Sequence, residues 1–179
     1  MEGNVRHQWH YPFKEAFGYE VTQNPRELRK LGKTIVSPYW DRCHLFRDGS
    51  ILALINDHGL IKVDNKSNLQ WKVSVPAHHD FWVTKSRIYV LKRTVTSIRN
   101  DKGQRDKIID EAILVLNHQG EILDEVSLTD SIINSDYSTL MFRTYGGVHN
   151  VVHSKIRTKD AFHANSIQVL GKKSQFLQE

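Results

Sequence analysis

The sequence predicts an all-β fold, a β-propeller fragment with about two complete four-stranded blades plus partial blades at both ends. One observation is a repeated hairpin, because residues 44–54 align with residues 79–91. Each copy has a histidine, a short apolar strand, a polar turn and a second run rich in Ile, Leu and Val. The other observation is a repeated strand, turn and strand, in which residues 59–73 align with residues 111–126. Short strands recurring at this spacing are typical of propeller blades.

The chain is expected to begin within a blade. Residues 1–10 are predicted to be the last strand of a preceding blade, since residues 3–9 resemble residues 67–71 at the end of the first complete blade. Residues 11–42 then form an inter-blade loop. This loop contains a short helix that Asn24 caps, with Pro at the first helical position and Gly after the last.

Two complete blades follow, at residues 43–76 and 79–127. The first hairpin turns at Asp48-Gly49, a pair that favours a tight turn between strands. The second blade is longer because residues 96–109 are rich in charged side chains and contain Gly103. They are expected to form an exposed loop insertion between the inner and outer pairs of strands.

The last part of the chain leads into a further blade. Residues 128–161 are an inter-blade segment, in which a short helix at residues 128–133 is expected to be capped by Thr129 or Asp130. Residues 162–179 are predicted to start the next blade with an opening strand. The chain is therefore expected to be an internal piece of a longer propeller.

Composition excludes several classes of function. The net charge is +5 and the pI is near 9.3, but Lys and Arg are scattered and interleaved with Asp, so we expect a solvated surface and no nucleic-acid partner. No apolar run approaches the roughly 18 residues of a transmembrane helix, and residues 1–11 lack the apolar centre of a signal peptide. Cys43 is the single cysteine, which excludes an internal disulfide and a paired-cysteine zinc site.

Three histidines occupy the same place in the repeat. His44, His79 and His163 each stand at the start of a blade's first strand, and in a propeller these strands line the central channel. Their imidazoles are expected to converge on one pocket, where His can act as acid, base, nucleophile or metal ligand. Asp80 can orient the ring of His79, and Asn165 shares a strand face with His163.

The alternative is that these histidines only tie neighbouring blades together through hydrogen bonds. Metal binding by three channel histidines is conceivable, but the predicted site contains no metal and no cofactor. Six further histidines have no shared place in the repeat and are expected on the surface or in loops: His7, His10, His58, His118, His149 and His153. The four tryptophans are expected to pack within the core or between blades: Trp9, Trp40, Trp71 and Trp82.

Three motifs resemble the arylsulfotransferase family of β-propellers. They are His78-His79-Asp80, the blade pattern that starts at Gly59, and Asp160-Ala-Phe-His163-Ala-Asn165-Ser166-Ile167. The resemblance covers most of the chain from about Ile51 onward. It implies a bacterial enzyme, periplasmic or membrane-associated, that moves a sulfuryl group from a phenolic sulfate donor to a phenol acceptor. It also implies a transiently sulfated histidine and no nucleotide donor.

The resemblance assigns roles to particular residues. His79 and His163 become the catalytic histidines that bind or polarise the sulfuryl oxygens, and Asn165 donates a hydrogen bond beside them. His44 and Asp80 are expected to contact substrate. The chain departs from the family pattern, because residues 171–179 contain no Arg to bind sulfate and the nucleophilic histidine belongs to a later blade. We therefore expect no activity in isolation, and a non-catalytic propeller that only binds partners is the alternative.

Overall fold

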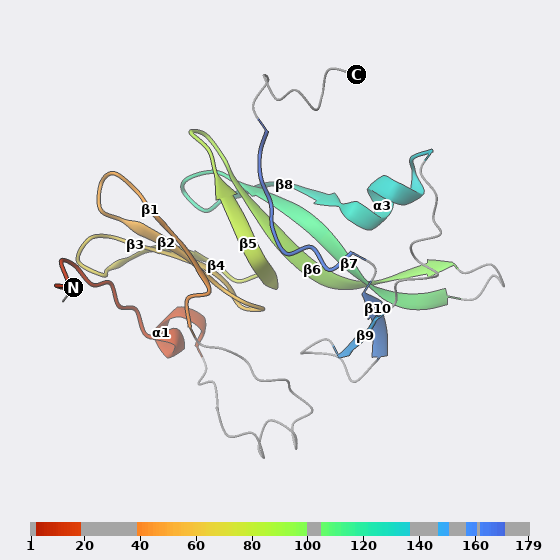
Figure 1. The fold of residues 1–179 in the computed structure, drawn as a ribbon, viewed down its shortest axis with the longest axis horizontal. Helices are drawn as coiled ribbons and strands as arrows, with labels where there is room; N and C mark the ends of the chain where they lie inside the picture. Colours follow the sequence, from red (N-terminus) through yellow and green to blue (C-terminus); the bar gives the residue numbers. More distant parts are fainter. Residues whose placement is uncertain are drawn as a thin grey trace, which may run out of the picture.

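The computed structural model describes residues 3–18, 39–99, 105–136, 147–150, 157–160 and 162–170. Within these ranges the chain is an all-β protein with two neighbouring sheets, the first antiparallel and the second mixed, and with two short helices (Figure 1). No helix in the described ranges has the length and apolar character needed to cross a membrane.

The first sheet is a four-stranded antiparallel meander in which each strand pairs with the next along the chain. Its strands are β1 (Arg42–Leu45), β2 (Ile51–Ile55), β3 (Gly59–Val63) and β4 (Leu69–Val73). Every residue of β2 is buried, because both faces of this sheet are covered. The predicted strands of the first repeat are confirmed, including the turn with Gly49, whose φ of 80° suits glycine.

The second sheet repeats the meander and extends it. Its first four strands are β5 (Ala77–Val83), β6 (Ile88–Arg99), β7 (Arg105–Leu116) and β8 (Ile122–Ser127). The C-terminal part of β7 pairs with β8, and an earlier part of β7 pairs in parallel with β10 (Arg157–Asp160). β10 then pairs with β9 (Gly147–Asn150) in antiparallel orientation. The sequence did not predict β9 and β10, which fall in the expected inter-blade segment.

The two sheets pack face to face across one apolar cluster. This cluster includes Leu52, Leu54 and Leu60 from the first sheet with Phe81, Ile88, Val90, Leu114 and Leu116 from the second. The opposite face of the first sheet is covered by the N-terminal segment, in a cluster of Ala16, Ile51, Ala53, Ile55, Ile61 and Val63 flanked by Trp9 and Trp40. Trp71 flanks the cluster between the sheets, so three of the four tryptophans pack as predicted.

Each described helix is shorter than two turns. α1 (Phe13–Phe17) was not predicted, although Pro12 before it and Gly18 after it, with φ of 80°, are recognisable boundary residues. α3 (Leu128–Ile133) has the predicted bounds, but its cap is Ser127, whose Oγ accepts a hydrogen bond from the N–H of Asp130. The predicted helix that begins at Asn24 lies outside the described residues.

The expected loop insertion at residues 96–109 is wrong over most of its length. β6 continues to Arg99 and β7 starts at Arg105, so the segment lengthens a hairpin. Ile108 and Ile109 are buried, and both pair with β10. The charged residues around Ile108 and Ile109 led to the prediction of an exposed loop. Both residues pair with β10, a strand about fifty residues later in the chain.

The predicted strands at the two ends are also wrong for the described residues. Residues 3–12 and 162–170 contain no strand. The N-terminal segment attaches instead through the indole of Trp9, which donates to the carbonyl of Gly49, and through the N–H of His10, which donates to Ser67 Oγ. Side-chain and turn contacts thus replace the expected pairing with a neighbouring strand.

Candidate functional site

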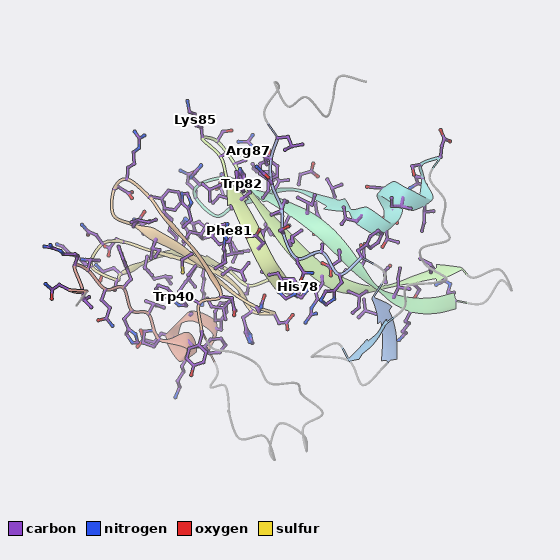
Figure 2. All side chains as sticks on the ribbon, viewed as in Figure 1. Trp40, His78, Phe81, Trp82, Lys85 and Arg87 are labelled. Carbon is purple, nitrogen blue, oxygen red and sulfur yellow. The ribbon has the colours of Figure 1, made fainter. Side chains whose placement is uncertain are left out.

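A bulge at the start of β5 places three functional residues. β5 pairs with β6 at Ala77↔Lys92 and again at Phe81↔Val90, so two extra residues of β5 (81 minus 77 against 92 minus 90) are accommodated between these pairs. His78, His79 and Asp80 occupy this bulge. Figure 2 shows His78 at the end of β5 opposite the turn that carries Lys85 and Arg87.

Two histidines of the site have a strained backbone conformation. His79 has φ of 57°, in the left-handed region that residues other than glycine rarely adopt. Its backbone N–H donates to Asn56 Oδ1 at 2.7 Å. His163, on the segment 162–170, has φ of 45°. Such conformations cost about 1–3 kcal/mol each and persist where the surrounding structure fixes them.

Three imidazoles meet at the bulge. The ring centroids of His78 and His79 are 3.7 Å apart, and the ring of His163 lies 5.7 Å from His79 and 5.9 Å from His78. One nitrogen from each ring lies within 4.8 Å of the other two. His78 is buried, His79 is half-buried and His163 is exposed, so the cluster reaches from the interior to solvent.

Asp80 holds the segment of His163 against β5. Its carboxylate accepts hydrogen bonds from the N–H of Phe81 at 2.9 Å and the N–H of Ile167 at 3.1 Å, and it pairs with Arg42 Nε at 3.0 Å. Ile167 is 87 residues from Asp80 in the sequence. The prediction that Asp80 orients the imidazole of His79 is therefore wrong. The Asp80 carboxylate instead binds the backbone of the segment 162–170, which carries His163.

Two further charged groups lie beside the cluster. Glu111 of β7 is fully buried, with a carboxylate oxygen 3.9 Å from Nε2 of His78. Arg93 of β6 forms a two-point ion pair with Asp57, with nitrogen to oxygen distances of 2.9 and 2.8 Å. The Arg93 charge is felt by both His78 and His79.

The environment favours the neutral form of His78 and His79. Burial, together with the charges of Arg93, His79 and His163, lowers the pKa of His78 to about 3. Burial and the charges of His163 and Arg93 also lower the pKa of His79. Neither ring nitrogen of His78 has a hydrogen-bond partner within the described ranges. At neutral pH His78 and His79 therefore offer imidazole lone pairs rather than positive charge.

The structure brings together two of the three predicted histidines. His44 lies on β1, paired with Leu52, and its ring contacts Phe46 at 4.7 Å between centroids. It lines a hollow between β1 and β5 with Cys43 and Trp82, and burial with the nearby His118 lowers its pKa. The prediction that His44 lies in the same pocket as His79 and His163 is therefore wrong.

Asn165 lies beside His163 as expected, but its side chain is already engaged. Its Nδ2 donates to the carbonyl of His163 at 2.9 Å. This hydrogen bond braces the backbone turn at His163, whose φ is positive. Asn165 therefore acts on the site by holding the backbone from which the imidazole projects.

Sequence reasoning missed His78, Arg93 and Glu111. The signal for His78 was its place beside His79, although neighbouring residues of a regular strand would point to opposite faces. Arg93 and Glu111 are paired on neighbouring strands. A charged residue within a largely apolar strand is unusual, and this could have indicated a functional site. His58 lies in the turn between β2 and β3, as expected for a loop residue, but it is buried against the rings of Phe13 and Phe17 rather than exposed.

Comparisons with models of protein families, with curated proteins and with solved structures found no match for this chain. The function of this chain is therefore inferred from the residues and the geometry of the site.

Proposed function

We propose that this chain contributes the sulfuryl-binding histidines of an arylsulfotransferase-like β-propeller, which transfers a sulfuryl group from a phenolic sulfate ester to a phenol. The observation that carries the proposal is the meeting of His79 and His163 from distant parts of the chain. The repeated antiparallel meander is compatible with successive propeller blades.

The chemistry has two steps, linked by a sulfated histidine. A histidine nitrogen first forms a bond to sulfur while the bond from sulfur to the donor oxygen breaks, and the released phenolate takes up a proton. The acceptor phenol oxygen then bonds to sulfur and loses its proton, while the histidine nitrogen is released. We assign to His79 and His163 the binding of the sulfuryl oxygens, not the attack on sulfur.

The state of the imidazoles supports this role. A neutral imidazole has one N–H, which can donate to a sulfuryl oxygen, and one lone pair. Burial lowers the pKa of His79, which favours the neutral ring with one N–H and one lone pair. Arg93 adds positive potential nearby, although its guanidinium is paired with Asp57.

Ester binding by the full chain tests the proposal. We expect isothermal titration calorimetry to detect binding of 4-nitrophenyl sulfate, and no comparable binding of 4-nitrophenol, which lacks the sulfuryl group. His79→Gln and His163→Gln should each weaken binding at least about ten-fold, since a hydrogen bond to a charged group contributes about 1.5–3 kcal/mol.

His44→Gln is the matched control, because His44 has the equivalent place in the first sheet but lies apart from the cluster. It should bind the ester as the unmodified chain does. Failure of the unmodified chain to bind the ester, or equal affinity in all three variants, would contradict the proposal.

A non-catalytic interaction module is the second candidate. It is favoured by large apolar side chains that are exposed on β8 and α3, namely Ile122, Leu123, Val126 and Ile133. This alternative predicts that phenolic sulfates do not bind at the histidines. The same titration therefore separates the two candidates.

A further inference from the structure

We propose that His78, His79 and His163 form a binding site for a divalent transition-metal ion, with Zn²⁺ as the ion that the ligands fit best. The three ring nitrogens that can face one ion lie within 4.8 Å of one another. The proposal is independent of sulfuryl transfer, because it concerns the lone pairs of the rings and requires no ester.

The distances are close to those of a metal site. With bonds of about 2.0–2.1 Å to a tetrahedral zinc ion, two ligand nitrogens stand about 3.3 Å apart. The nitrogens of the cluster would therefore approach by at most about 1.5 Å when an ion binds. His163 is exposed and sits on a segment without strand pairing, so its ring can make most of this movement.

The buried member of the set, His78, makes no hydrogen bond through its ring among the described residues. His78 is only 3% exposed, and neither of its ring nitrogens makes a hydrogen bond there. Leaving a buried polar side chain in this state costs about 1–3 kcal/mol, which coordination of an ion would recover. This is a second observation, separate from the grouping of the three rings, that points to a ligand.

The ligand type selects the class of ion. Neutral imidazoles suit Zn²⁺, Cu²⁺ and Ni²⁺, whereas Mg²⁺ and Ca²⁺ require oxygen ligands. Three protein ligands with His163 at the solvent side leave a fourth position open, the arrangement of zinc sites that bind a water or a substrate.

Groups around the cluster suit a bound cation. Nε2 of His78 lies 3.9 Å from Glu111, so a small shift would let this N–H donate to the carboxylate while Nδ1 faces the ion. A carboxylate behind a ligand histidine is the usual support for such a site. The carboxylate of Asp57 pairs with Arg93 and offsets part of its positive charge at His79.

The backbone is fixed in a conformation that presents two of the ligands. His79 and His163 both have positive φ, at 57° and 45°. The bulge of β5, the hydrogen bond from His79 N–H to Asn56 and the hydrogen bond from Ile167 N–H to Asp80 hold them there. The cost of ordering the ligands is thus met by folding, which favours binding.

Titration of the full chain, freed of metal, with ZnCl₂ tests the site. We expect calorimetry to show one tight ion per chain, and Co²⁺ to give the intense visible absorption of a tetrahedral site. His163→Gln and His79→Gln should each weaken Zn²⁺ binding at least about ten-fold, because even supporting residues are worth that much. His163→Gln is the decisive variant, since an exposed side chain can be changed without loss of the fold.

His44→Gln is again the matched control and should bind Zn²⁺ as the unmodified chain does. Circular dichroism of each variant checks that it is folded. The proposal is overturned if the unmodified chain binds no ion, if folded His163→Gln binds as tightly as the unmodified chain, or if His44→Gln loses as much affinity. None of these results depends on ester binding, so either proposal can fail alone.

Discussion

The first strands of the two sheets have the same place in the repeat but very different local structures. β1 pairs with β2 without interruption, and His44 stands opposite Leu52 in regular register. β5 loses its register with β6 between Ala77 and Phe81, and His79 there has a left-handed backbone. A regular strand presents its histidine to a surface hollow, whereas the bulged strand turns its histidines toward another segment.

The third strands differ in a matching way. Gly59 at the start of β3 aligns with Glu111 in β7. A Cβ atom at Gly59 would lie 1.9 Å from the carbonyl oxygen of Val73, so only glycine fits where β3 and β4 approach. At Glu111 the second sheet has room for a buried carboxylate next to His78. The same repeat position is therefore a site of close backbone packing in the first sheet and holds a buried carboxylate in the second.

Gly59→Ala should have the largest effect. It adds a clash with backbone to a φ of 136°, and we expect the free energy of unfolding to fall by about 3 kcal/mol or more. Urea denaturation measures the change. Gly18→Ala is the control, because Gly18 has φ of 80° with open space around it, and it should lose only about 1 kcal/mol. Equal losses would show that the close approach in the first sheet is unimportant.

Asp80→Ala should have the next largest effect. Its carboxylate has three partners, but Arg42 is half exposed, so we discount that ion pair and expect a loss of about 2 kcal/mol in unfolding free energy. Hydrogen exchange should become faster at Ile167, which loses its acceptor. The residue in the same place in the first sheet is Leu45, which is 58% exposed, and Leu45→Ala should change stability by less than about 0.5 kcal/mol. Unchanged exchange at Ile167 would remove Asp80 from its assigned role.

Acid should destabilise the chain through His78. Its pKa is about 3 when folded against an ordinary 6.5, so between these values the unfolded state binds more protons. Stability should therefore fall as pH drops below 6.5, with a contribution of at most about 1.4 kcal/mol per pH unit from this residue. His78→Gln should flatten the dependence between about pH 6.5 and 4.5, measured by urea denaturation.

His44→Gln is the comparison for the pH series. Burial lowers the pKa of His44 as well, but His44 is only half-buried, so its removal should flatten the curve less. If both variants gave the same slope as the unmodified chain, the buried state of His78 could not be the source of acid sensitivity.

Local signals made much of the fold predictable. The turn at Asp48-Gly49 and the apolar run of β2 follow from neighbouring residues, and both are as expected. The meeting of His79 and His163 was predicted from their shared place in the repeat, and the two rings do lie together. The sequence pattern therefore predicted the strands correctly where each strand pairs with its neighbour without interruption, as in β1 and β2.

The rest of the site depends on contacts that no local pattern contains. Residues 78–80 read as ordinary strand, so the bulge and the burial of His78 were not visible in the sequence. The position of His163 depends on the hydrogen bond between Ile167 and Asp80, across 87 residues. His44 shares the repeat position but lacks a bulge, which is why it stays apart from the cluster.

Glycine substitution at the two equivalent histidines should produce the smallest effects, and effects that differ between the sheets. His44 is in extended strand, so His44→Gly should cost about 1 kcal/mol of stability through chain entropy. At His79 the φ of 57° already costs about 1–2 kcal/mol for a side chain, and glycine removes that cost. The gain offsets the entropy, so His79→Gly should lie within about 0.5 kcal/mol of the unmodified chain. Urea denaturation of the two variants side by side measures this. A loss at His79 as large as that at His44 would mean that the bulge holds no strain, and that the two first strands differ less than their backbones indicate.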